Sequence, residues 1–384
     1  MYKKIFITFL LVFMFFPFTV FGEELIPNST SGILMEASTG KIIYEKDKDK
    51  EVSIASMTKM VAQIIILEEI DKGNIKWSDK VTISENAASM GGSQIYLSPG
   101  EEITIDDLMK GISVASGNDA TVAMAEVIAG SESKFVELMN KKVKSLGLKH
   151  TVFKNCTGLD EEGHYSTAYD QAVIARYLIN NHPTILDYSS IYEDYLREDT
   201  ENKFWLVNTN KLIRFYDGAD GLKTGHTDNA GYCLTATMEK NNMRLISIVM
   251  GEDSKDNRTN DTISMMEYGF NNYGSQTIIN KNDYSKIMTI NNAKDREVKY
   301  YLKDNVNMIV NKSDNNVNYK IKEYLYDVKA PLNKNTKVGE LKITYDNNIY
   351  SYDLIVKEDI YKNSFINVFN NLLKDIIGGV KINN

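Results

Sequence analysis

Residues 53–71 read SIASMTKMVAQIIILEEID, and this stretch predicts both a helix and the position of two reactive side chains at its start. Apolar residues such as Met60 and Ile64 recur at helical spacing, which predicts a helix that begins at Ser56 and runs to about residue 71. Ser56 and Lys59 then lie on one face of this helix, a single turn apart. The stretch therefore puts a hydroxyl beside an amine at the start of a helix.

This pairing is the pattern of an activated serine. A serine hydroxyl is a poor nucleophile unless a base removes its proton, and a lysine can do so when its own pKa is lowered. Burial and a neighbouring cation both lower a lysine pKa. At a helix start the N–H of Ser56 is also free to stabilise an oxyanion. Alone the pattern S-x-x-K is weak, because an N-cap serine followed by a solvated lysine has the same spacing.

Two further short motifs follow in the chain, Ser116-Gly117-Asn118 and Lys223-Thr224-Gly225. The second hydroxyl can relay a proton and the amide can hold a substrate amide. The second lysine can bind a terminal carboxylate and lower the pKa of Lys59. Gly225, on a strand edge, leaves room for an extended peptide. The order S-x-x-K, S-x-N, K-T-G is that of the penicillin-recognising acyl-serine enzymes.

The chain resembles the D-alanyl-D-alanine carboxypeptidases, which are low-molecular-mass penicillin-binding proteins of serine peptidase family S11. The resemblance covers essentially the whole mature chain. It departs at Cys156, where similar sequences often carry proline, in a loop without a catalytic motif. The stretches that carry it are SIASMTK at 53–59, GSQIYL at 92–97, GLD at 158–160, HYSTA at 164–168, DGLKTGHT at 220–227 and AGY at 230–232.

The resemblance implies a serine-type hydrolase that removes the terminal D-alanine from peptidoglycan pentapeptide stems. Lys59 would take the proton of Ser56, whose oxygen attacks the penultimate D-alanine carbonyl. The N–H groups of Ser56 and His226 would hold the oxyanion. Ser116, hydrogen-bonded to Lys59 in the family, would return the proton to the leaving D-alanine. The implied substrate-binding residues are Asn118, Lys223, Thr224, Gly225 and His226.

The resemblance also implies that no cofactor is required and that β-lactam antibiotics acylate Ser56. Three alternatives remain: a serine β-lactamase, a peptidoglycan DD-endopeptidase on the same fold, or a catalytically inactive cell-wall binding protein. A β-lactamase would lack the segment 276–384, and a binding protein has no need of an intact nucleophile. Release of D-alanine from a pentapeptide would separate these functions.

Residues 23–275 predict the catalytic domain. The fold class is α+β, a penicillin-binding and β-lactamase-like transpeptidase domain with an antiparallel sheet and helices. The expected elements are a hairpin over 31–46, helical stretches over 104–129 and 132–145, and strands over 231–238 and 244–250.

The remainder of the chain predicts a second domain, a signal peptide at the N-terminus and an amphipathic helix at the C-terminus. Short alternating segments over 276–360 indicate a small all-β, sandwich-like domain. Residues 361–384 form an amphipathic pattern, which predicts either a helix docked on the β domain or, our preferred interpretation, a membrane anchor through residues 363–384. Residues 1–22 read as a cleaved signal peptide, since the apolar run from Ile5 is shorter than the roughly 20 residues of a spanning helix. We therefore expect an exported protein, held peripherally at the extracytoplasmic face of the membrane in the cell-wall compartment.

Charge and composition exclude several classes. The 384 residues carry 44 basic and 52 acidic side chains, a net charge of −8 that argues against nucleic-acid binding. Without Lys3 and Lys4 the mature chain has 42 basic side chains and a net charge of −10. The four histidines lack metal-ligand spacing, so we expect no metal site. The pattern leaves open whether Cys156 and Cys233 pair.

Overall fold

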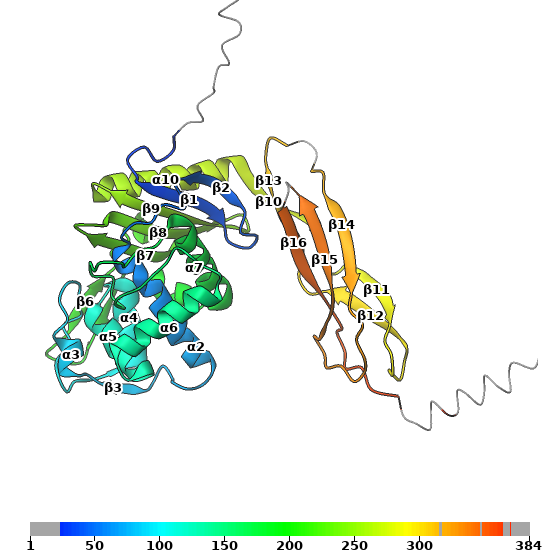
Figure 1. Cartoon of the computed structure of the whole chain (residues 1–384), viewed down its shortest axis with the longest axis horizontal. Coiled ribbons are helices and arrows are strands. Elements are labelled where there is room, and N and C mark those ends of the chain that lie inside the picture. Colours follow the sequence, from blue (N-terminus) through cyan, green and yellow to red (C-terminus); the bar gives the residue numbers. More distant parts are fainter. Residues whose placement is uncertain (1–23, 315–316, 346–347, 364–368, 370–384) are drawn as a thin grey trace, which may run out of the picture. The chain divides into compact units, whose positions relative to one another are not determined.

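The computed structural model describes residues 24–314, 317–345, 348–363 and 369 (Figure 1). The predicted signal peptide 1–22 lies outside these residues, as do 364–368 and 370–384 of the predicted amphipathic helix. The chain splits into two compact units. Most of the first lies between residues 42 and 267, and most of the second begins at Tyr268. In the described part of the chain, no helix is both long and apolar enough to cross a membrane.

The first unit is built on a five-stranded sheet in the order β2-β1-β9-β8-β7. The pairs β1–β2 and β7–β8 are antiparallel. One helix, α10, lies on one face of this sheet, and the other helices gather on the opposite face (Figure 1). The strands are β1 (Ser31–Glu36), β2 (Ile42–Lys46), β7 (Ala219–Thr227), β8 (Gly231–Lys240) and β9 (Met243–Glu252).

The helices of this unit carry the predicted motifs. The predicted stretch over 132–145 is confirmed as α6, but the stretch over 104–129 is two helices, broken around Ser116 and Gly117. The elements are η1 (Ala55–Thr58), α2 (Lys59–Asp71), α3 (Glu85–Ala88), α4 (Ile105–Val114), α5 (Asn118–Ala129), α6 (Glu132–Ser145), α7 (Ala168–Asn181), α8 (Ile185–Ser189), α9 (Leu212–Phe215) and α10 (Lys255–Asn272).

Two small hairpins complete the first unit. Strand β3 (Lys80–Thr82) pairs with β4 (Glu102–Thr104), and β5 (Glu193–Leu196) pairs with β6 (Phe204–Val207). The predicted hairpin over 31–46 is confirmed as β1 and β2, and the predicted strands after residue 230 are confirmed as β8 and β9. The core of the unit includes α2, which is buried along most of its length because its apolar residues cover all sides.

The second unit is all β, as the alternating segments predicted. Its five-stranded sheet has the order β11-β12-β16-β15-β14, and β10 pairs with β13. Strand β10 begins at Tyr273, so it straddles residue 276, where the sequence placed the domain boundary. The strands are β10 (Tyr273–Ile279), β11 (Ser285–Thr289), β12 (Glu297–Leu302), β13 (Val306–Asn311), β14 (Lys320–Leu325), β15 (Lys337–Tyr345) and β16 (Asn348–Ile355).

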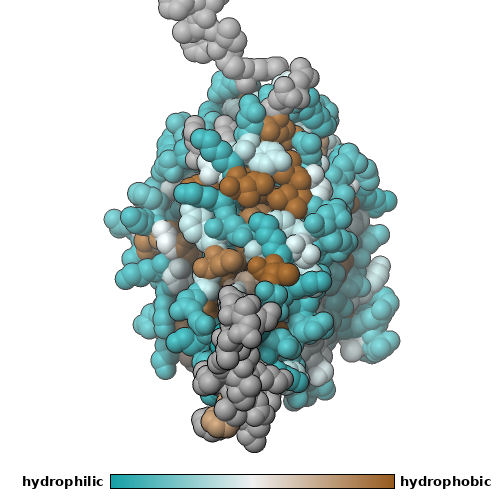
Figure 2. Space-filling model, turned by 90° about the vertical axis from the view of Figure 1, so that its right-hand side faces the viewer, coloured by the Kyte–Doolittle hydropathy of each residue, from teal (hydrophilic) through white to brown (hydrophobic). Residues whose placement is uncertain are grey.

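Apolar side chains also reach the surface. Figure 2 shows a face on which hydrophobic residues form small patches among hydrophilic ones. In the β domain, Ile287, Ile321 and Ile349 are exposed large apolar side chains. Scattered exposure of this kind is normal for soluble domains.

Candidate active site

Ser56 lies in the 3-10 turn η1, directly before α2. The sequence predicted a helix beginning at Ser56, whereas the regular α-helix begins at Lys59. Ala55, the preceding residue, has a left-handed backbone with φ +46°, which is uncommon for a side chain with a Cβ. A strained conformation of this kind persists only where the surroundings fix it.

Two glycines fix the backbone at Ser56. A Cβ on Gly225 of β7 would lie 2.7 Å from the Ile54 carbonyl oxygen, and a Cβ on Gly158 would lie 1.9 Å from the Ala55 carbonyl oxygen. Both separations are below what a real Cβ tolerates. Gly225 was predicted to make room for a peptide, and it also makes room for η1 itself. The two glycines therefore allow the strand and the loop to approach the turn that carries Ser56 closely on both sides.

Lys59 is completely buried beside Ser56, and its Nζ lies 2.8 Å from Ser56 Oγ. The same ammonium donates to Asn118 Oδ1 and to the Thr157 carbonyl oxygen, both at 2.7 Å. Burial lowers the pKa of Lys59 to about 7, although Cys156 and Asp119 oppose this shift. A lysine with this pKa is neutral in part at physiological pH and can then accept a proton.

The break between α4 and α5 positions the second motif. Ser116 has φ +64° and is buried, and α5 begins at Asn118. Asn118 accepts from Lys59 and donates to the Gly91 carbonyl oxygen at 2.7 Å. The resemblance implied a hydrogen bond between Ser116 and Lys59, but Ser116 Oγ has no hydrogen-bond partner here. The three donors of Lys59 are instead used by Ser56, Asn118 and Thr157.

Asp119 holds the loop that faces Ser56. Its buried carboxylate accepts from the backbone N–H groups of Ile95 and Leu97 at 3.0–3.1 Å. The Asn118 N–H donates to the Ser93 carbonyl oxygen at 2.7 Å. These contacts fix the GSQIYL stretch of residues 92–97 against the start of α5.

Strand β7 brings the third motif alongside η1. Thr224 Oγ1 lies 2.7 Å from Thr209 Oγ1, and the His226 ring stacks on Tyr232 with ring centroids 4.0 Å apart. Lys223 is fully buried, and its Nζ donates to the Thr224 carbonyl oxygen at 3.0 Å. Burial, followed by the positive charges of Lys59 and Arg258, holds the pKa of Lys223 well below its usual range.

Two cavities meet at Ser56 and His226. The larger, of about 520 Å³, is lined by Ser56, Ser93, Ser116, Asn208, Thr209, Lys211, Thr224, Gly225, His226, Tyr232, Lys255, Asp256, Arg258 and Thr259. The smaller, of about 310 Å³, is lined by Ser56, Gly92, Ser93, Asn118, Thr157, Gly158, Leu159, His226 and Thr227. Of the eight predicted site residues, these cavities bring together Ser56, Ser116, Asn118, Thr224, Gly225 and His226. Lys59 and Lys223 lie buried behind them.

Sequence reasoning did not identify Arg258 as a site residue. Its guanidinium is nearly buried in the wall of the larger cavity, and its Nε has no hydrogen-bond partner. A buried cation with a free donor favours an anionic ligand. The arginine lies in α10, outside every motif, so no local spacing signalled it. Ser93 and Thr157 were missed as well, although Ser93 belongs to a stretch that carried the resemblance.

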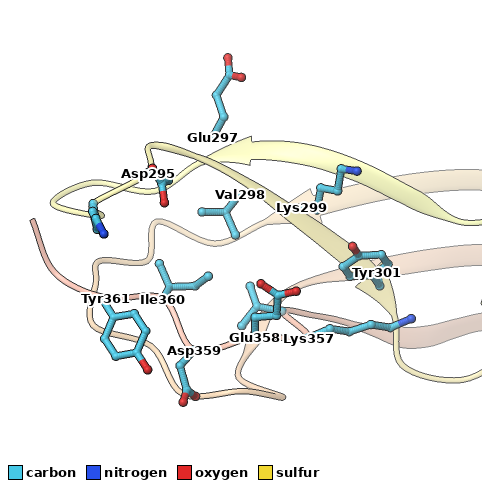
Figure 3. A pocket seen from close by; sticks show the side chains of 12 residues that line it. Asp295, Glu297, Val298, Lys299, Tyr301, Lys357, Glu358, Asp359, Ile360 and Tyr361 are labelled. Atoms are coloured by element: carbon cyan, nitrogen blue, oxygen red, sulfur yellow. The ribbon is translucent and has the colours of Figure 1, made fainter.

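The two cysteines, Cys156 and Cys233, are free, buried thiols. The β domain has its own cavity of about 380 Å³ (Figure 3). Its lining combines apolar residues such as Val298 and Ile360 with charged ones such as Lys357 and Glu358. Among its lining residues there is no serine, cysteine or histidine that could act as a nucleophile or a general base.

Family models match both units of the chain. Residues 23–254 match the model described as D-alanyl-D-alanine carboxypeptidase, peptidase S11. Residues 273–362 match the C-terminal domain of penicillin-binding protein 5.

The proteins and solved structures that resemble this chain are named as D-alanyl-D-alanine carboxypeptidases or penicillin-binding proteins. The chain is 44% identical over 356 residues to the D-alanyl-D-alanine carboxypeptidase DacF of Bacillus subtilis, covering 92% of this chain and 91% of that protein. It is 40% identical over 252 residues to DacA of Escherichia coli, covering 63% and 61% of the two chains. Penicillin-binding protein 5 from Haemophilus influenzae matches with a TM-score of 0.71 at 30% identity, over 87% of this chain and 98% of that one. An ampicillin-bound structure of penicillin-binding protein D2 from Listeria monocytogenes matches with a TM-score of 0.57 at 30% identity, over 63% and 98%.

Proposed function

Because the chain belongs to the peptidase S11 family of D-alanyl-D-alanine carboxypeptidases, we propose that it removes the terminal D-alanine from peptidoglycan pentapeptide stems through an acyl-enzyme on Ser56. One observation carries the proposal. The Nζ of a fully buried lysine with a lowered pKa lies 2.8 Å from Ser56 Oγ. At this distance the neutral amine of Lys59 can accept the proton of Ser56.

The reaction then proceeds in two halves. In the first, Ser56 Oγ bonds to the carbonyl carbon of the penultimate D-alanine and passes its proton to Lys59. The C–N bond to the terminal D-alanine breaks, and the proton reaches the leaving amine with help from Ser116 Oγ, which has no competing hydrogen bond. In the second half, water attacks the ester, releases the shortened peptide and restores Ser56. The N–H groups of Ser56 and His226 stabilise the oxyanion in both halves.

The substrate is held on either side of the scissile bond. Asn118 orients the peptide from the smaller cavity. Thr224 and Arg258 contact the terminal carboxylate in the larger cavity, and the buried Lys223 lies behind its wall. No cofactor takes part. We further infer that the protein is exported and attached at the extracytoplasmic face of the membrane through residues 363–384, on the strength of the sequence patterns at the two ends.

Incubation with penicillin tests the nucleophile. Intact-mass spectrometry of the full mature chain is expected to show a single covalent adduct, which peptide mapping locates at Ser56. The Ser56→Ala variant is expected to form none, because the hydroxyl that opens the ring is gone. A wild-type protein without an adduct would refute the acyl-enzyme.

Substrate assays separate the alternatives. Wild-type protein is expected to release D-alanine from a pentapeptide and to turn over penicillin slowly. Rapid penicillin turnover without D-alanine release would identify a β-lactamase. Cleavage of cross-linked dimers without release from monomers would identify a DD-endopeptidase.

A further inference from the structure

An aromatic pair lies on the outer face of the hairpin formed by β5 and β6, outside the active site. Tyr195 and Trp205 are direct cross-strand partners, so their side chains project side by side from the same face. They are 42% and 55% exposed, and the Lys203 ammonium lies 3.8 Å from the centre of the Tyr195 ring, so Trp205 offers the more open ring of the two. Trp205 is one of only two tryptophans in the sequence. Aromatic rings that the fold leaves in solvent in this way commonly mark a binding surface.

The hairpin is firmly attached through its other face. Leu196 and Leu206 are buried on that face, and Phe204 packs edge-to-face against Tyr96 with ring centroids 5.5 Å apart. At the end of β5, Arg197 pairs with Glu101 and donates to the Ile95 carbonyl oxygen at 3.1 Å. The pair on the outer face is thus carried by a rigid support, and it has no role in this packing.

The same hairpin runs directly into the substrate cavity. Asn208 and Thr209 follow β6 and line the cavity that contains Ser56. Thr209 is four positions after Trp205 in the chain, so their Cα atoms are at most about 14 Å apart. In a peptidoglycan stem, four residues lead from the sugar to the penultimate D-alanine carbonyl, a similar reach. One substrate molecule can therefore contact the cavity with its peptide and the hairpin with its sugar.

The charge of the hairpin narrows the choice of ligand. Residues 193–207 contain five acidic side chains against Arg197 and Lys203. An acidic surface repels polyanions and anionic lipid headgroups. An uncharged saccharide remains compatible, because the C–H face of a pyranose ring packs on an aromatic ring without needing charge.

We propose that Tyr195 and Trp205 form a saccharide-binding platform that holds the N-acetylated glycan strand of the substrate while its peptide stem occupies the active site. The platform rests on the proposed function, since that function supplies a peptide attached to a glycan. Pentapeptide stems attached to the glycan strand therefore bind to this protein more tightly than free pentapeptides do.

Kinetics on two substrates test the platform. For Trp205→Ala, the KM for D-alanine release from glycan-attached pentapeptide is expected to rise about tenfold, which corresponds to about 1.4 kcal/mol. The kcat on that substrate and both constants on free pentapeptide are expected to stay unchanged. Phe215→Ala, which removes an exposed aromatic of the same unit outside the hairpin, is the matched control and is expected to leave all constants unchanged. Equal losses on both substrates, or no loss on either, would overturn the platform.

A binding measurement that needs no catalysis separates this proposal from the proposed function. Trp77→Phe leaves Trp205 as the only tryptophan, and its fluorescence is expected to change saturably with β-1,4-linked N-acetylglucosamine oligomers. Adding Ser56→Ala is expected to leave that titration unchanged. An unchanged spectrum throughout the titration would overturn the platform even if D-alanine release is normal, and a saturable change would support it even if D-alanine release is absent.

Discussion

At the scale of single residues, the active site depends on how Lys59 is buried. A lysine on a solvated helix face keeps its proton at neutral pH and cannot act as a base. Here the amine is enclosed completely, and burial outweighs the nearby Asp119 in setting its pKa at about 7. Cys156, the residue at which the chain departs from similar sequences, also lies close enough to influence this pKa. The departure thus lies beside the catalytic base, although the sequence placed it in an unremarkable loop.

The pKa of Lys59 predicts the pH dependence of acylation. The base acts when it is neutral, so the rate of penicillin acylation at Ser56 is expected to rise as the pH increases through about 7 and to level off above it. Rapid-quench measurements with labelled penicillin between about pH 5 and pH 9 would record this profile. His164 does not explain such a rise, since burial lowers its pKa to about 4.

A control variant isolates the lysine. Lys59→Met keeps the length and apolar character of the side chain and removes the amine, and it is expected to lower acylation at least about a hundredfold. A wild-type rate that is constant across this range would contradict the assignment of Lys59 as the base.

At the scale of secondary structure, the two edge strands of the β-domain sheet are joined through one carboxylate. Glu323 of edge strand β14 accepts hydrogen bonds from Tyr300 of β12 at 2.8 Å, from Lys286 of edge strand β11 at 3.0 Å and from Tyr284. Burial opposes ionisation of this carboxyl, but these hydrogen bonds outweigh it and lower the Glu323 pKa. Glu323 thus links the two edges of the sheet through side-chain hydrogen bonds.

Glu323→Gln is expected to lower the free energy of unfolding of the β domain by about 1–3 kcal/mol, because the donors lose a charged acceptor. Urea unfolding of the full chain followed by tyrosine fluorescence measures the change. Because the folded pKa is depressed, the wild-type advantage is present above the ordinary glutamate pKa and is lost as the pH falls through the folded value.

Glu297→Gln serves as the control, since this side chain of β12 is exposed. It is expected to change stability less than Glu323→Gln. Penicillin acylation of Ser56 is expected to persist in both variants. A Glu323→Gln protein as stable as wild type would contradict the linking role.

At the scale of the whole molecule, the chain combines a catalytic unit with a β domain that contributes none of the residues lining the cavities at Ser56. The structure describes the β domain as far as residue 363, where the predicted anchor of residues 363–384 begins.

Deletion of residues 363–384 is expected to move the protein from the membrane fraction to the soluble fraction, because the apolar face that would enter the lipid interface is removed. Fractionation of cells, with penicillin labelling of each fraction, measures the distribution and confirms that the catalytic unit is still active. An unchanged distribution would favour the alternative of a helix docked on the β domain.

The sequence alone determined the fold class, the order of the motifs and the identity of most site residues. Ser56 and Lys59 were identifiable because their spacing is local, and a helical turn fixes which side chains neighbour each other. Only the tertiary structure decided the lowered pKa of Lys59, the unpartnered hydroxyl of Ser116 and the presence of Arg258 in the cavity wall. Each of these depends on burial and on contacts between residues far apart in the chain, where local spacing carries no signal. The exposure of Trp205 also depends on tertiary packing, because the alternation of residues along its strand does not indicate which face of the hairpin the rest of the protein covers.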